Sequence, residues 1–380
     1  MARVAVVGVG RIGLRVAWEL ASRGFEVAVM DSRRSALARA ASVVDGAEEV
    51  LVDASSVQAL ARALRGFDYA VYALPGSLGP VGVEASIEAG VDGVDVSFYR
   101  DVPVGLSGPA ARAGVRVLVD AGVAPGLSNM LVGMAYRELG GLEGAHILVG
   151  GVARDPAANP LGLAATWNAE DLVEEYIRPA RLLRRGEVVS VDPLSSACRA
   201  RLPGGLVMEA FPTDGLRSLI YTMSGIVGEL VEYTLRHPGH LEILDTMRRL
   251  GLLDESPVHV DGCMVKPRAF TARLIERSTR GVEDIVVLAV KAWRDARAEA
   301  FYTLVEPEGG WSAMSRATGG FAAAALERVI AGGALREAGI HYPEEVGLAG
   351  SGHLILEDLA LRGIRVERVS PGDVLVEECG

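Results

Sequence analysis

Three glycines stand at the spacing Gly8-x-Gly10-x-x-Gly13, directly after a short run of β-branched residues and before an apolar pattern of helical period. This arrangement can bind a pyrophosphate, because the first glycine permits a tight turn, the second lets backbone approach the phosphates and the third lets the helix pack on the strand. The helix N-terminus would face the phosphates. The pattern predicts a dinucleotide-binding turn made of Gly8, Gly10, Arg11, Ile12 and Gly13.

A second apolar run ends in Asp31, followed by Ser32. A carboxylate at this point accepts hydrogen bonds from the adenosine ribose hydroxyls and repels a 2′-phosphate, so the sequence predicts NAD as the cofactor. Arg33 and Arg34 come next and could accommodate a 2′-phosphate. NADP therefore stays an alternative.

Strand and helix patterns continue to alternate, with apolar runs at residues 48–53, 68–74, 92–97 and 114–120. Alternation of this kind predicts a Rossmann-type, doubly wound parallel sheet, whose ligands lie at the carboxyl ends of the strands. Polar or turn-forming residues collect at those ends, namely Asp53, Leu74, Pro75, Gly76, Asp95, Ser97 and Asp120. Any one of them could be a helix cap or turn residue. Together they predict a site, with Asp53 at the adenine edge and residues 74–76 over the nicotinamide ribose.

The stretch "VLVDAGVAPGLSNML" (residues 117–131) reads as a strand ending in Asp120, a Gly/Pro-rich turn and a helix capped by Ser128. We expect this junction to leave the nucleotide-binding domain and to place Asp120 beside a ligand. Beyond it, the pattern changes to longer strands with period-two alternation, broken by helices. A second, α+β domain with a mixed or antiparallel sheet is therefore predicted.

Polar side chains cluster again at Thr234, Arg236, His237 and His240 around a Pro-Gly bend, and Arg217 lies between a turn and an apolar segment. Arginine offers a fork of donors to a carboxylate, and histidine titrates near neutrality. The histidines lack the HxxxH and HExxH spacings, so no metal site is predicted. The arginine run in "RPARLLRRG" (residues 178–186) is read as a solvated helix end.

Bulk properties exclude several classes of protein. A net charge of −11 and a pI near 5.2 argue against nucleic acid as a partner. No apolar run is long enough to span a bilayer. The three cysteines form no paired framework and no cleavable leader is recognised, so we expect a cytoplasmic protein.

The motifs "DAGVAPGLSNML", "NPLGLAATWN" and "EYTLRHPGHLE" resemble the saccharopine dehydrogenase-like family. Further segments, including "ALPGSLG", "GVDVSFYRDV", "WNAEDLVEEYIRPARLLRRGE", "DGLRSL" and "SAMSRATGG", resemble its lysine 6-dehydrogenase branch. The resemblance covers nearly the whole chain. It implies a nucleotide-binding domain over residues 1–128, a substrate-binding and dimerisation domain over 129–311, and a segment over 312–380 that returns to the first domain. A homodimer is expected.

The resemblance also implies a reaction: NAD-dependent oxidative deamination of the ε-amine of L-lysine to the 6-semialdehyde. His240, Thr234 and Asp95 are then the expected catalytic residues, and Arg217, Arg236 and Asp120 the expected substrate-binding residues. Saccharopine reductases of the family carry an Asp in an "LDPG" turn where this chain has Ala124, which disfavours saccharopine. A saccharopine reductase-like or polyamine-forming enzyme and a non-catalytic NAD-sensing protein remain alternatives.

Overall fold

The computed structural model describes residues 1–78, 80–98, 101–164 and 169–377. The chain forms two compact units. The first comprises Met1–Arg137 and Ser315–Arg365, and the second comprises Glu138–Met314 and the chain from Val366 onward. The segment expected to return to the first domain is thus divided between the two units.

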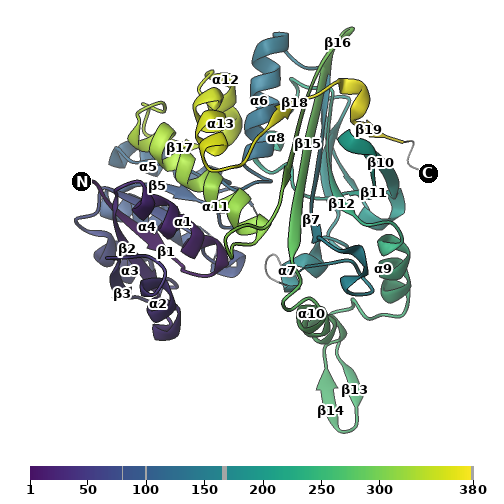
Figure 1. The fold of residues 1–380 in the computed structure, drawn as a ribbon, viewed down its shortest axis with the longest axis horizontal. Coiled ribbons are helices and arrows are strands. Elements are labelled where there is room, and N and C mark those ends of the chain that lie inside the picture. Colours follow the sequence, from purple (N-terminus) through teal and green to yellow (C-terminus); the bar gives the residue numbers. More distant parts are fainter. Residues whose placement is uncertain (79, 99–100, 165–168, 378–380) are drawn as a thin grey trace. The chain divides into compact units, whose positions relative to one another are not determined.

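The first unit is built on a parallel sheet, seven-stranded in the described part of the chain, with the order β17-β6-β5-β4-β1-β2-β3 (Figure 1). The strands are β1 (Arg3–Val7), β2 (Glu26–Asp31), β3 (Glu48–Leu51), β4 (Tyr69–Tyr72), β5 (Asp92–Asp95), β6 (Arg116–Leu118) and β17 (Gly339–His341). The helices are α1 (Arg11–Ser22), α2 (Arg34–Ala41), α3 (Val57–Leu64), α4 (Val81–Ala89), α5 (Ser107–Ala113), α6 (Leu127–Leu139), α11 (Ala313–Ala325), α12 (Pro343–Leu348) and α13 (Gly352–Leu361). The predicted doubly wound Rossmann-type sheet is confirmed.

Apolar strand residues explain this layering. On one side of the sheet, strand residues such as Val7 and Met30 pack with Leu60 and Leu64 of α3. A second cluster includes Val83 of α4 and Val117 of β6. Strands that are buried on both faces read as continuous apolar runs, and this is the pattern that the sequence shows.

A buried ionic network connects α1, whose N-terminus follows the glycine-rich turn, to α13. Glu19 accepts hydrogen bonds from Arg15 and from Arg362, and the Nε atom of Arg362 donates to Asp358 at 2.9 Å. Breaking such a buried pair would leave an unpaired charge in the interior. The network therefore holds α1 in one position relative to α13.

The second unit contains a mixed sheet, ten-stranded among the described residues, whose main path is β18-β16-β15-β7-β12-β11-β10-β19. The strands on this path are β7 (Gly144–Ala153), β10 (Cys198–Leu202), β11 (Leu206–Pro212), β12 (Glu229–Arg236), β15 (Asp284–Arg294), β16 (Arg297–Val305), β18 (Glu367–Arg368) and β19 (Leu375–Val376). Strand β8 (Ala180–Arg184) also pairs with β12, and β9 (Glu187–Val191) pairs with β8. Strands β7 and β12 pair in parallel and the other neighbours are antiparallel. The expected α+β domain with a mixed sheet is confirmed.

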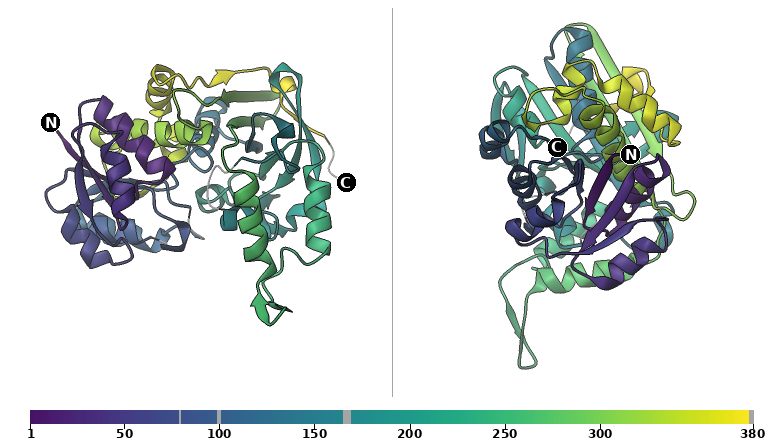
Figure 2. Two further views of the ribbon diagram at one scale, coloured as in Figure 1. Left: turned by 60° about the horizontal axis from the view of Figure 1, so that its bottom comes forward. Right: turned by 90° about the vertical axis from the view of Figure 1, so that its left-hand side faces the viewer.

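Four helices belong to the second unit, within the residues described: α7 (Ala169–Glu174), α8 (Ser218–Met223), α9 (His240–Arg249) and α10 (Pro267–Ser278). Apolar residues of α7, α9 and α10 pack in one cluster with Phe211 of β11, so these helices cover that face of the sheet. A hairpin of β13 (Val258–Val260) and β14 (Cys263–Val265) extends away from the rest of the unit in every view (Figure 2).

The structure bears on two expectations from the sequence, one about the cysteines and one about membrane-spanning segments. Cys198 is disulfide-bonded, so the expectation that the cysteines do not pair is wrong. Sequence spacing does not show which distant segments the fold brings together, and pairing depends on that approach. Within the described residues, no helix has both the length and the apolar character that crossing a bilayer requires.

Candidate functional site

The glycine-rich turn of the first unit joins β1 to α1. Gly8 has a φ of 85°, and a Cβ atom there would lie 2.5 Å from the carbonyl oxygen of Ala73. A Cβ on Gly13 would lie 1.9 Å from the carbonyl oxygen of Gly8. Gly10 differs, because a Cβ there would meet no atom within 4 Å. The turn thus has tight packing at the first and third glycines and open space at the second, which fits backbone contact with a pyrophosphate.

Asp31 is the last residue of β2 and lies against this turn. Its Oδ2 atom accepts a hydrogen bond of 3.1 Å from the backbone N–H of Val9, and its Oδ1 atom accepts one of 2.9 Å from that of Arg33. Burial would raise the pKa of Asp31, but hydrogen bonds from Arg33 and Val9 outweigh burial and hold the pKa below its ordinary value. Asp31 is therefore an anionic acceptor, while Arg33 and Ser32 are largely exposed beside it.

The structure brings Leu74, Asp95 and Ser97 together at the carboxyl ends of β4 and β5. The Oγ atom of Ser97 accepts from the backbone N–H of Leu74 at 3.0 Å, and Oδ1 of Asp95 accepts from the N–H of Ser97 at 2.7 Å. Pro75 and Gly76 follow in the adjoining turn. Asp53 is separate from this group: it is exposed, lies two residues beyond the end of β3, and accepts a bond of 2.9 Å from Ser55.

Asp120 follows β6 and is buried with a φ of 55°, a left-handed conformation that is uncommon for residues other than glycine. Next to it, the backbone N–H of Ala121 donates to the carbonyl oxygen of Asp95 at 2.9 Å. Strain of this kind at a strand end is a feature of functional sites. Helix α6 begins at Leu127, so Ser128 lies inside the helix and is not its cap. Its hydroxyl bonds to Asn129 instead.

In the second unit, Arg236 and His240 are joined through Tyr176, a residue that the sequence did not single out. The hydroxyl oxygen of Tyr176 accepts from the Nε atom of Arg236 at 2.8 Å and lies 2.8 Å from Nε2 of His240. The other nitrogens of Arg236 donate to the carbonyl oxygen of Leu235 and to Glu175, at 2.9 and 2.7 Å. All three residues Tyr176, Arg236 and His240 are buried.

His240 is neutral in this network. Its Nδ1 atom lies 2.8 Å from the carbonyl oxygen of Leu161, which can only accept, so Nδ1 carries the proton. The Nε2 atom must then accept from the hydroxyl of Tyr176. Burial, followed by the nearby charge of Arg236, lowers the pKa of His240 to about 3.

Thr234 lies two residues before Arg236 on β12, and its hydroxyl group bonds to the hydroxyl group of Thr213. Its Oγ1 atom is 2.8 Å from that of Thr213, and Thr213 donates to Oε1 of Glu232 at 3.2 Å. Glu232 is buried, and no described residue supplies a partner to its Oε2 atom. Burial, then the nearby charge of Glu175, raises the pKa of Glu232 to about 8. The alternation of Glu232, Thr234 and Arg236 along one strand face was a signal that could have identified Glu232.

Arg217 precedes α8 and is also buried, with a φ of 54°. Its positive charge acts on Glu232, where it partly offsets the effect of burial. The arrangement in this unit therefore combines a buried guanidinium, a carboxyl group of raised pKa and a pair of bonded hydroxyls. Such groups can bind a small zwitterion and move a proton.

The interpretation of residues 178–186 as a solvated helix end is wrong. Helix α7 ends at Glu174, and residues 180–184 form β8, in which Leu182 and Leu183 are buried. Arg181 pairs with Asp214 through Nε and Nη2, at 2.8 and 2.9 Å. A specific acidic partner and buried leucines, rather than solvent, determine the conformation of this run.

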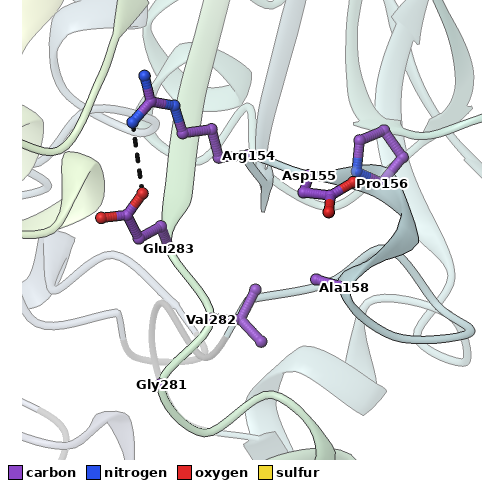
Figure 3. Close-up of a pocket in the computed structure, with 7 residues that line it drawn as sticks. All are labelled: Arg154, Asp155, Pro156, Ala158, Gly281, Val282 and Glu283. Carbon is purple, nitrogen blue, oxygen red and sulfur yellow. Dashed lines mark hydrogen bonds and ion pairs between the residues drawn. The ribbon is translucent and has the colours of Figure 1, made fainter.

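A surface pocket of about 700 Å³ in the second unit is lined by Arg154, Asp155, Pro156, Ala158, Gly281, Val282 and Glu283 (Figure 3). It contains none of the site residues expected from the sequence. Its arginine pairs with Glu283 at 3.3 Å. In the described part of the chain, no group of three or more His, Cys, Asp or Glu side chains could hold a metal ion.

Parts of four motifs lie outside the described residues: position 79 of "ALPGSLG", positions 99–100 of "GVDVSFYRDV", positions 165–168 of "NPLGLAATWN" and positions 167–168 of "WNAEDLVEEYIRPARLLRRGE". Over the whole chain, two family models match. The saccharopine dehydrogenase NADP binding domain matches residues 4–118, and the saccharopine dehydrogenase C-terminal domain matches residues 122–364. The first unit is thus a nicotinamide dinucleotide-binding domain, and its open glycine turn fits that cofactor.

Several proteins are similar to this chain. Alpha-aminoadipic semialdehyde synthase of Arabidopsis thaliana is 28% identical over 225 residues, which are 56% of this chain and 21% of that protein. Its mitochondrial counterpart in Mus musculus is 29% identical over 198 residues, 49% of this chain and 21% of that protein. The chain therefore spans about a fifth of the length of these two relatives.

A yeast protein covers more of the chain. Saccharopine dehydrogenase [NADP(+), L-glutamate-forming] of Saccharomyces cerevisiae is 22% identical over 308 residues, 77% of this chain and 68% of that protein. A solved structure of saccharopine dehydrogenase (L-Glu forming) from the same organism has a TM-score of 0.80 and 19% identity, and covers 97% of this chain and 100% of the other. This likeness shows the fold.

Proposed function

Because the chain belongs to the saccharopine dehydrogenase family, we propose that it catalyses NAD-dependent oxidative deamination of the ε-amine of L-lysine. The product would be 2-aminoadipate 6-semialdehyde, which cyclises to piperideine-6-carboxylate. One observation carries this proposal: the second unit buries Arg217, Glu232 and the bonded hydroxyls of Thr213 and Thr234 together. Buried ionisable groups with shifted pKa values cluster at catalytic sites, so Glu232, whose pKa is raised to about 8, supports an enzyme.

The cofactor supplies the redox chemistry, since its nicotinamide accepts the hydride from the substrate carbon. The residues proposed to hold it are the glycine turn with Arg11 and Ile12, the acceptors Asp31 and Ser32, and the strand-end residues Asp53, Leu74, Pro75, Gly76 and Ser97. The bond between Val9 and Asp31 supports NAD, because it keeps an anionic acceptor beside the turn. Asp31 disfavours a 2′-phosphate by charge.

Arg217 is the proposed anchor for the substrate α-carboxylate, because a guanidinium binds a carboxylate through paired hydrogen bonds. Arg236 was expected to share this role. Its bonds to Tyr176, Leu235 and Glu175 support a different one, in which it positions Tyr176. Thr234 is proposed to orient the water that attacks the substrate imine.

Two further residues keep the roles expected from the sequence. Asp120 is proposed to contact substrate, and its strained backbone supports a functional role. Asp95 is proposed as a catalytic carboxylate, which Ser97 holds in place. His240 was also expected to act as a base, but its neutral, doubly bonded imidazole supports a positioning role.

Saccharopine is the main alternative substrate, since the yeast relative is named for it. The uncharged Ala124 supports lysine over saccharopine. To decide, the purified protein is incubated with NAD or NADP and with lysine, ornithine, cadaverine or saccharopine, and the absorbance of the reduced cofactor is followed. We expect lysine with NAD to react fastest. Faster oxidation of saccharopine would replace the lysine assignment, and no reaction with any substrate would favour a non-catalytic, NAD-sensing protein.

A cytoplasmic homodimer stays a prediction. Sedimentation can test whether the protein is a dimer.

A further inference from the structure

Lysine oxidation requires a base, because hydride leaves the ε-carbon only when the amine is neutral, and a free lysine amine has a pKa near 10.4. His240 is poorly suited to this task, since its Nδ1 proton is held by Leu161 and its Nε2 atom by Tyr176. The second unit contains another acceptor, which lies at the end of a chain of hydroxyl groups.

We propose that Glu232 accepts the proton of the substrate ammonium group through the hydroxyls of Thr234 and Thr213. The distances permit this relay: Thr234 Oγ1 lies 2.8 Å from Thr213 Oγ1, which lies 3.2 Å from Oε1 of Glu232. The inference rests on the proposed function and identifies the base of that reaction.

The proton balance is simple. An N–H bond of the ammonium group breaks as an O–H bond forms on Thr234, the proton of Thr234 moves to Thr213, and the proton of Thr213 moves to Glu232. A cation and a carboxylate become a neutral amine and a neutral carboxylic acid. Burial favours this exchange, because a low-dielectric interior penalises both charged groups.

The structure leaves Glu232 available for this role, whereas the neighbouring acids are paired with arginines. Asp214 pairs with Arg181 at 2.8 Å and lies 3.9 Å from Arg178, and Glu175 pairs with Arg236 at 2.7 Å. Glu232 is influenced by Glu175, Asp214 and Arg217, but no described residue bonds to its Oε2 atom. Its pKa of about 8 places its ionisation near the range in which lysine begins to lose its proton.

The missing side chain of Gly215 leaves room for this carboxyl group. A Cβ atom on Gly215 would lie 1.7 Å from Oε1 of Glu232, so the chain passes directly over the group. The backbone φ of Gly215 is not in the left-handed region, and alanine would therefore conflict with Glu232 and not with its own backbone. The variant Gly215→Ala tests the position of the carboxyl without removing it.

The first test measures kcat/KM for lysine against pH in wild type, Glu232→Gln, Thr213→Val and Thr213→Ser. We expect wild-type kcat/KM to rise through about pH 8, and Glu232→Gln to lose both this rise and about 10²–10⁴-fold in rate. Thr213→Val should show a similar loss, and Thr213→Ser, which keeps the hydroxyl, should restore most of the activity. Gly215→Ala should weaken activity in the same pH-dependent way. If Glu232→Gln keeps the wild-type profile, Glu232 is not the base and the proposed function stands.

The second test needs no turnover. Infrared spectra detect the C=O band of a protonated carboxyl group, which should fade in wild type between about pH 6 and about pH 9.5 and should be absent from the difference spectrum of Glu232→Gln. Lysine added at the higher pH with reduced cofactor, a pair that cannot react, should restore the band. Norleucine, which lacks the ε-amine, should not. If lysine leaves the band unchanged, the proton transfer is refuted. If the band returns although the protein oxidises no amine, the proposed function alone fails.

Discussion

The Nε2 atom of His240 lies 2.8 Å from the hydroxyl oxygen of Tyr176, which also accepts a hydrogen bond of 2.8 Å from Arg236. Because the hydroxyl group of Tyr176 accepts one hydrogen bond from Arg236 and donates another to His240, the three side chains form a directed chain of hydrogen bonds. Burial raises the pKa of Tyr176 to about 12 and lowers that of His240 to about 3, so neither group changes charge near neutrality.

His240→Asn should therefore reduce activity by the same factor across the pH range. The variant loses an acceptor for Tyr176 but no proton acceptor of the reaction. The measurement is the ratio of kcat/KM between variant and wild type from about pH 7 to about pH 10, with thermal melting as the control for folding. A loss that shrinks as pH approaches the lysine pKa would instead identify His240 as a base.

Replacing Arg217 with alanine should affect substrate preference, whereas replacing Arg236 with alanine should affect stability. Removing a carboxylate anchor should cost about 2–5 kcal/mol in apparent transition-state binding, so Arg217→Ala should lose the preference for lysine over cadaverine, which has no carboxylate. Arg236→Ala should instead lower the free energy of unfolding by about 3–5 kcal/mol, since Glu175 and Tyr176 lose a buried partner. Steady-state kinetics and urea unfolding separate the two. Unchanged discrimination in both variants would exclude both arginines as anchors.

Replacing Asp31 with Ser should weaken NAD binding and raise the relative use of NADP. The variant loses the ribose acceptor and the negative charge that opposes a 2′-phosphate, while Arg33 stays beside the site. Titrations of both cofactors at fixed lysine concentration measure the change. A wild-type protein that already prefers NADP would show that Arg33 or Arg34, and not Asp31, determines the choice.

Glu232 should make the stability of the fold depend on pH. Its pKa is raised from 4.5 to about 8 in the folded protein, which therefore binds this proton more tightly than the unfolded chain does. The resulting stability is fully present below about pH 4.5 and is lost as pH rises through about 8. Between about pH 5 and about pH 9, wild type should lose about 4 kcal/mol relative to Glu232→Gln. A constant difference in urea unfolding would mean that Glu232 titrates normally.

The parts of the fold that depend on short-range patterns were predictable. Gly8, Gly10, Gly13 and Asp31 lie close in sequence, and each has a local role, so the nucleotide-binding turn could be read directly. Apolar runs and period-two alternation likewise predicted five of the ten described strands of the mixed sheet, namely β7, β9, β11, β15 and β16. Strand β8 was among those missed, because its arginine-rich sequence was interpreted as a helix end, although it forms a hairpin with the adjacent strand β9.

The chemistry of the second unit was harder to predict for the same reason. Thr234, Arg236 and His240 form one short motif, but the groups that determine their roles come from elsewhere: Tyr176 precedes His240 by 64 positions, and Thr213 precedes Thr234 by 21. In the sequence, Glu232 looks like an ordinary strand residue. Only the fold brings Thr213 and Gly215 against its carboxyl group. Burial, which shifts its pKa, is a property of the packed structure alone.

The central claim is that the ε-nitrogen of lysine is the one released. The protein is incubated with NAD and with L-lysine carrying nitrogen-15 at either the α or the ε position, and the label in free ammonium is measured by mass spectrometry. We predict that the ε label appears in ammonium in proportion to the cofactor reduced, while the α label stays in the cyclised product. Release of the α label, or reduction of cofactor without labelled ammonium, would contradict the account.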